Sequence, residues 1–94
     1  MTESATKLNR SGFVSIDIPE ELAEPLIDVV RHYIHAKMKH PCFPDCIVHQ
    51  GSLITEEVGE AVMNANDNNV GLFKHEVGQV CAVSLRTLIH LQHK

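Results

Sequence analysis

The segment at residues 54–64, with the sequence ITEEVGEAVMN, constrains the fold of this chain more than any other. Its apolar residues recur at the spacing of one face of an α-helix, in which successive residues turn by about 100°. Glu57, Glu60 and Asn64 form a neighbouring stripe, and Glu56 lies beside it. The segment is therefore predicted to be a helix that packs along an apolar edge and carries an acidic edge next to it.

This acidic edge has two interpretations. Glutamates at this spacing on a helix are most often a solvated face that makes no specific contact. Alternatively, they form part of a magnesium site, because a hard cation prefers several carboxylate oxygens and glutamates one turn apart can converge on it. Residues elsewhere in the chain are needed to distinguish a solvated face from a magnesium site.

Prolines and turn residues divide the chain into three helical segments. The first is expected within residues 19–39 and becomes regular only from Glu24, because Pro25 interrupts the hydrogen bonding. The second is expected at residues 50–66, and the sequence NDNN ends it, since Asn and Asp favour turn conformations. The third is expected at residues 70–91, beginning at the first or second of these positions.

The residues before the first helix are expected to lie outside the bundle. Residues 1–12 are polar and lack periodicity, which predicts a flexible tail before a single domain at residues 13–94. Residues 13–18, FVSIDI, alternate apolar and polar residues, which predicts a short extended arm. A single strand cannot form a sheet, and whether this arm pairs with a second copy of the chain stays open. The predicted fold class is all-α, a bundle of about three main helices per chain that oligomerisation completes.

Composition limits the classes of function. The 94 residues are 44% hydrophobic and only 4% aromatic, so the core is expected to be small and aliphatic, and an oligomer would enlarge it. The net charge is −4 and no run of Lys or Arg is present, which argues against a nucleic-acid polymer as the partner. No apolar run approaches the roughly 20 residues of a membrane span or resembles a signal peptide, so we expect a soluble, cytoplasmic protein.

The connection between the first two helices suggests a different metal site. His40, Cys42, Cys46 and His49 are all of the types that bind zinc. Their spacing differs from the common zinc patterns, which take pairs of ligands from two separate elements, and two prolines among them would strain a tetrahedral site. A turn that contains small apolar thiols is the alternative interpretation.

The third helical segment carries a second polar stripe. Glu76 and Gln79 lie about one turn apart on it, and Arg86 and His90 continue the stripe. The short connection favours antiparallel packing of the second and third helices, which would bring Glu60 close to Glu76. Carboxylates that face one another repel, and a divalent cation relieves the repulsion. The two helices together therefore strengthen the magnesium interpretation.

At these residues the chain resembles a known family. The pattern EExxE at residues 56–60, followed by EVGQ at residues 76–79, resembles the signature of MazG-like nucleoside triphosphate pyrophosphohydrolases, an all-α family. The similarity covers about residues 32–91 and is to the small single-domain, phage-type members. It implies a homodimer or homotetramer that hydrolyses a nucleoside or deoxynucleoside triphosphate to the monophosphate and pyrophosphate, with Mg²⁺, or Mn²⁺ in its place, as the cofactor.

The resemblance also implies site residues. Carried over by position, the catalytic candidates that bind metal or activate water are Glu56 and Glu57, and the metal-ligand candidates are Glu57, Glu60, Glu76 and Gln79. Apart from the resemblance, substrate contacts are expected from Lys74, Arg86 and Asn64, and further candidates to neutralise phosphates are Arg31 and Lys39. The sequence does not choose among these four cations, and the alternative interpretation of each is an ordinary solvated charge.

One position departs from the family pattern. The second motif usually reads ExxD, and Gln79 stands at its last position. An amide oxygen can coordinate magnesium, but it adds no negative charge and cannot act as a base. Two alternatives to the enzyme therefore stay open: a weakened member that binds a nucleotide or a protein partner without turnover, and a purely structural helical oligomer. The sequence does not determine base or sugar preference.

Overall fold

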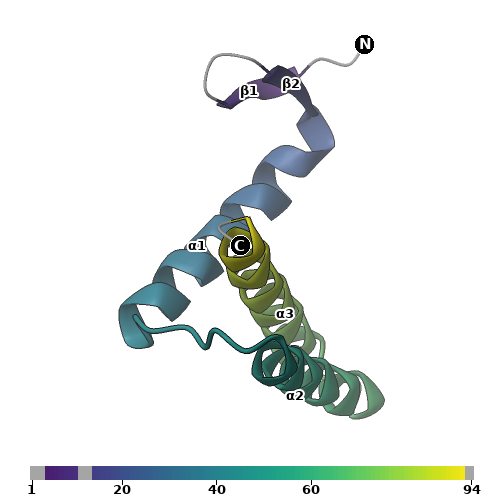
Figure 1. Ribbon diagram of the computed structural model, residues 1–94. Coiled ribbons are helices and arrows are strands. Elements are labelled where there is room, and N and C mark those ends of the chain that lie inside the picture. Colours follow the sequence, from purple (N-terminus) through teal and green to yellow (C-terminus); the bar gives the residue numbers. More distant parts are fainter. Residues whose placement is uncertain (1–3, 11–13, 93–94) are drawn as a thin grey trace.

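Three packed helices form most of the protein. The computed structural model describes the backbone of residues 4–10 and 14–92 and the side chains of residues 16–92. Two strands come first, β1 (Ser4–Arg10) and β2 (Val14–Pro19), followed by a 3-10 turn (Glu20–Leu22) and the helices α1 (Ala23–Lys39), α2 (Ile47–Asn66) and α3 (Val70–Leu91) (Figure 1). The predicted all-α class is confirmed.

The helix boundaries follow local sequence signals. Pro25 lies in the first turn of α1, where a missing N–H group is tolerated. α2 begins at Ile47, three residues before the predicted start. Asn69 caps α3 because its side chain accepts a hydrogen bond from the Leu72 amide at 3.1 Å. Asn68 adopts the left-handed conformation, with φ of 59°, which completes the turn between α2 and α3.

α3 is the central helix of the bundle. It packs against both α1 and α2, and the short turn at residues 67–69 makes α2 and α3 antiparallel neighbours (Figure 1). α1 crosses α3 at a steep angle and leads away from α2 (Figure 1). A cleft therefore lies between α1 and α2, with α3 as its floor. None of the described helices is long and apolar enough to cross a membrane.

The buried interior is small. Among the described side chains, the buried hydrophobic ones are Ile18, Ala61 and Ala82. Alanines at helix contacts allow the helices to approach closely, since they add little volume. Gln50 is 1% exposed, and its side-chain amide donates a hydrogen bond to the Pro44 carbonyl at 2.6 Å. This bond ties the start of α2 to the connection that precedes it.

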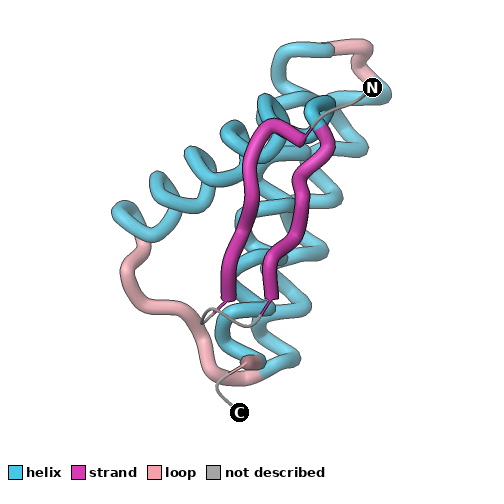
Figure 2. The backbone as a smooth tube through the Cα atoms, turned by 90° about the horizontal axis from the view of Figure 1, so that it is seen from above, coloured by secondary structure: helices cyan, strands magenta, loops and turns pink. Residues whose placement is uncertain are grey.

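The N-terminal residues form a β-hairpin. β1 pairs with β2 in antiparallel register from Arg10 opposite Val14 to Ser4 opposite Pro19, with an irregularity between Ser4 and Thr6. The hairpin lies at the N-terminal end of α1 (Figures 1 and 2). The predicted extended arm therefore pairs with residues next to it in sequence, since Ser4–Arg10 forms a strand within the segment predicted as a flexible tail. Phe13 and residues 1–3, 11 and 12 lie outside the described residues.

Candidate functional site

Three carboxylates from two helices converge at one point. Glu57 and Glu60 are separated by about one turn of α2, and Glu76 comes from the second turn of α3. One oxygen atom from each of the three lies within 4.8 Å of the others. The predicted meeting of Glu60 and Glu76 is confirmed. We call this group the carboxylate cluster.

The electrostatics of the carboxylate cluster are unfavourable without a cation. Burial, together with a hydrogen bond to Glu76 and the charges of Glu60, Glu76 and Glu56, raises the pKa of Glu57 from 4.5 to about 7. The charge of Glu76 is also the largest cause that raises the pKa of Glu60. Near neutral pH the folded protein therefore holds closely spaced carboxylates that resist ionising together.

One oxygen of this cluster is buried and unsatisfied. The Oε1 atom of Glu76 is inaccessible to solvent and accepts no hydrogen bond from the described chain. A buried carboxylate oxygen without a donor costs free energy, which a bound cation would recover. Three carboxylates with an unsatisfied oxygen among them are a donor set that suits a hard divalent cation such as Mg²⁺. The residues present therefore fit the predicted metal.

The other predicted residues of α2 lie next to the carboxylate cluster. Glu56 is exposed, and its charge raises the pKa of both Glu57 and Glu60. Asn64 donates a hydrogen bond from its side-chain amide to the backbone carbonyl of Glu60 at 3.0 Å. Glu56 also lines the cleft, so it borders both the cluster and the space where a substrate would lie.

Gln79 points towards α1 and contacts a histidine. Its Oε1 atom lies 3.0 Å from Nδ1 of His32, and the ring of His75 lies 5.1 Å from the ring of His32 between centroids. Gly78 completes the contact, since a Cβ atom at this position would overlap the His32 ring. Three positions of α3 therefore hold His32. The sequence analysis missed His32 as a site residue, although a glycine inside a helix is a signal of close approach.

The carboxylate cluster opens onto the cleft between α1 and α2. The cleft encloses about 950 Å³, which is within the range of small-molecule sites. Glu56 and Glu57 line it from α2, while Arg31, His35 and Lys39 line it from α1. Four of the seven histidines in the chain lie on its walls, namely His32, His35, His40 and His75.

Arg86 and Lys74, the two other basic residues predicted to contact the substrate, do not lie on the α1 wall of the cleft. Arg86 is buried, and its guanidinium donates hydrogen bonds to the carbonyls of His40 at 2.8 Å and Ala36 at 3.4 Å. It also stacks over the ring of Phe43, 4.7 Å from the centroid, and lines the cleft from the floor. Arg86 thus caps the C-terminal end of α1. Lys74 is exposed and is not among the residues that line the cleft.

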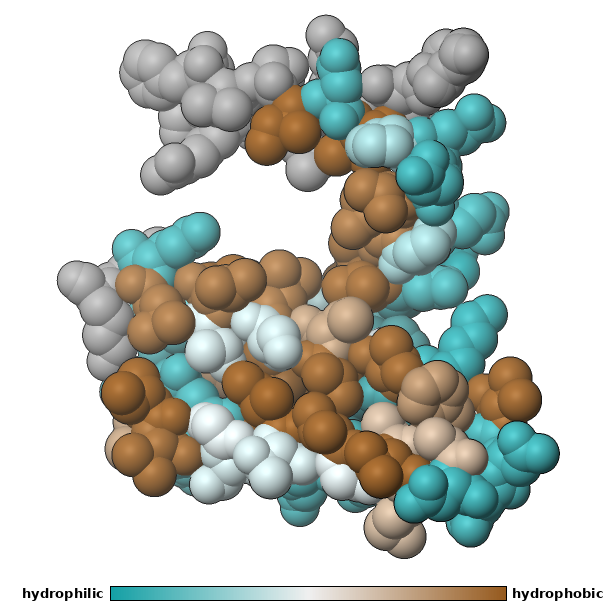
Figure 3. Space-filling view, turned by 90° about the vertical axis from the view of Figure 1, so that its right-hand side faces the viewer, coloured by the Kyte–Doolittle hydropathy of each residue, from teal (hydrophilic) through white to brown (hydrophobic). Residues whose placement is uncertain are grey.

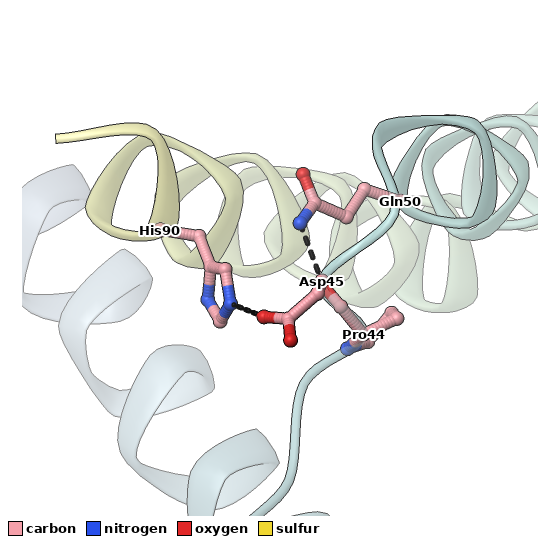
Figure 4. Close-up of polar contacts among 4 residues, drawn as sticks. All are labelled: Pro44, Asp45, Gln50 and His90. Atoms are coloured by element: carbon pink, nitrogen blue, oxygen red, sulfur yellow. Dashed lines mark hydrogen bonds and ion pairs between the residues drawn. The ribbon is translucent and has the colours of Figure 1, made fainter. Parts of the chain in front are cut away.

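Side-chain hydrogen bonds join the connection at residues 40–46 to α3 and α2. The side chains of His90 and Asp45 form a hydrogen bond with 2.7 Å between Nε2 and Oδ1, next to the bond from Gln50 to Pro44 (Figure 4). Cys42 and Cys46, two candidates for the zinc site considered above, are exposed. Within residues 16–92, the carboxylate cluster is the group of His, Cys, Asp or Glu side chains close enough to hold a metal. The geometry therefore favours the interpretation of this connection as a turn.

Comparison with known proteins adds no relative: no family model, curated protein or solved structure matches the chain.

Proposed function

We propose that the protein is a magnesium-dependent nucleoside triphosphate pyrophosphohydrolase. The observation that carries the proposal is the convergence of Glu57, Glu60 and Glu76 at the edge of a cleft with basic residues on its other wall. A substrate that combines a divalent cation with a chain of phosphates fits both features. The resemblance of the two acidic motifs to the MazG-like family supports the same reaction.

In this proposal each carboxylate has a defined role. Glu57, Glu60 and Glu76 would hold the metal, which when bound would neutralise charge on the phosphates and help to orient a water molecule. Glu56 is exposed at the edge of the cleft and accepts the proton of that water. The water oxygen forms a bond to the α-phosphorus, the bond from that phosphorus to the α–β bridging oxygen breaks, and pyrophosphate leaves.

A second candidate function is nucleotide binding without turnover. It is favoured by Gln79, whose amide oxygen contacts His32 and whose side chain carries no charge. Replacing Gln79 with Asp discriminates between the two functions. A large gain in magnesium affinity and in nucleotide hydrolysis supports a weakened site, whereas robust hydrolysis by the wild-type protein excludes it.

We further propose that the chain works as a homodimer or homotetramer. The apolar face of α1 is incompletely covered, with Leu26 37%, Val30 47% and Ile34 49% exposed. Apolar residues also gather over much of the face seen in Figure 3. The buried hydrophobic set of the described chain contains only three residues, which is little for a stable monomer of this size. Analytical ultracentrifugation tests this assembly, and a monomer at micromolar concentration would contradict it.

The enzymatic proposal is tested by incubating the pure protein with a panel of nucleoside and deoxynucleoside triphosphates and Mg²⁺, and by measuring pyrophosphate release. Release is expected from the wild-type protein and is expected to be lost in Glu57→Ala and Glu60→Ala. A matched control is Glu21→Gln, which removes one negative charge from an exposed residue before α1. If no nucleotide turns over, and Glu57→Ala and Glu60→Ala leave nucleotide affinity unchanged, the proposal is wrong.

A further inference from the structure

A row of basic residues runs along the α1 wall of the cleft. Arg31, His35 and Lys39 follow one another at intervals of four residues, so they lie on one side of the helix. All three are exposed and line the cleft, as do Glu56 and Glu57 from α2. The cleft therefore has a basic wall on α1 and an acidic wall on α2.

The charges of this row are available to a ligand. Neither Arg31 nor Lys39 forms an ion pair with any described side chain. Arg86, by contrast, directs its guanidinium at two backbone carbonyls, and Lys74 is not part of the cleft lining. Of the four cations predicted to neutralise phosphates, Arg31 and Lys39 are therefore the two that line the cleft without being engaged by backbone carbonyls.

We propose that Arg31, His35 and Lys39 form a binding site for a polyphosphate chain. The row extends about 12 Å along the helix axis, which allows contacts to more than one phosphate group. Arg presents paired donors to phosphate oxygens, whereas Lys acts as a point charge. This proposal rests on the proposed function for the identity of the nucleotide, but the binding of the phosphate chain itself is measurable without turnover.

Inorganic triphosphate is the probe that isolates this site. Its binding to the full chain is measured by isothermal titration calorimetry at low salt, with and without Mg²⁺, because salt screens exposed charges. The variant Arg31→Gln/Lys39→Gln is expected to weaken triphosphate binding at least about tenfold. The control Lys37→Glu lowers the net charge by the same two units at an exposed residue of α1 outside the cleft lining, and its affinity is expected to stay within about twofold of the wild type.

The outcomes separate this proposal from the proposed function. Magnesium-induced stabilisation should be equal in Arg31→Gln/Lys39→Gln and the wild type, since the row is not part of the carboxylate cluster. If no nucleotide is hydrolysed but the variant loses triphosphate affinity, the proposed function fails and the polyphosphate site stands. If nucleotides are hydrolysed and the variant binds triphosphate as tightly as its control, the polyphosphate site is refuted. A wild-type protein that does not bind triphosphate also refutes it.

Discussion

Replacing Glu57 with Gln should stabilise the protein in the absence of metal. Burial and neighbouring carboxylates raise the pKa of Glu57 from 4.5 to about 7, so the folded state retains a proton that the unfolded state releases. The free energy of unfolding of the metal-free wild type therefore decreases as the pH rises from about 4.5 to about 7. Glu57→Gln removes this decrease, because its side chain does not ionise.

The size of the effect follows from the pKa. A rise from 4.5 to about 7 corresponds to at most about 3.4 kcal/mol above pH 7. The carboxyl group is only half-buried, so solvent screening reduces the expected gain to about 1–2 kcal/mol. For a chain of 94 residues this raises the melting temperature by roughly 5–10 °C.

Magnesium should stabilise the wild type more than the Glu57→Gln variant. Saturating Mg²⁺ at about 100 times its Kd stabilises the wild type by about 2.7 kcal/mol, whereas the variant lacks one ligand and gains less. Thermal unfolding at pH 8, with a chelator and then with Mg²⁺, measures both effects, and Glu21→Gln serves as the control for loss of one charge. Repulsion within the metal-free cluster is refuted if metal-free Glu57→Gln melts no higher than the wild type, and metal binding by Glu57 is refuted if Mg²⁺ stabilises the two proteins equally.

Three further substitutions test the contacts around the cleft. Gly78→Ala adds a methyl group that overlaps the His32 ring, so denaturant unfolding should show a loss of about 1–3 kcal/mol, partly restored by adding His32→Ala. Arg86→Met leaves two carbonyls without their donor and should cost about 2–4 kcal/mol in the same assay, and a loss below about 0.5 kcal/mol would contradict its capping role. Asn69→Ala removes the cap of α3 and should lower the free energy of unfolding by about 1 kcal/mol, with little change if Leu72 finds another acceptor.

Local signals in the sequence predicted the three helices and the meeting of Glu60 with Glu76. The boundaries of α3 follow from the turn residues before it, and Pro25 does not disrupt α1 because it lies in the first turn. The meeting of Glu60 with Glu76 follows from helical spacing and one short connection. Such features depend on residues close together in the chain, so periodicity and turn chemistry are sufficient to predict them.

Contacts between distant segments were not predictable in the same way. The pairing of Gln79 with His32 depends on the angle at which α1 crosses α3, and helical periodicity alone does not specify this angle. Arg86 likewise reaches backbone carbonyls about 50 residues earlier, which no side-chain pattern reveals. The strand at Ser4–Arg10 was missed because its polar residues show no alternation.

Calorimetric titration with Mg²⁺ tests most directly whether Glu57, Glu60 and Glu76 form a divalent-metal site. The wild-type protein should bind Mg²⁺ with saturable heat, and binding should weaken at least about tenfold in Glu60→Gln and Glu76→Gln but not in Glu21→Gln. Absence of saturable binding by the wild type, or equal affinity in all four proteins, would contradict such a site and leave the acidic stripe as a solvated helix face.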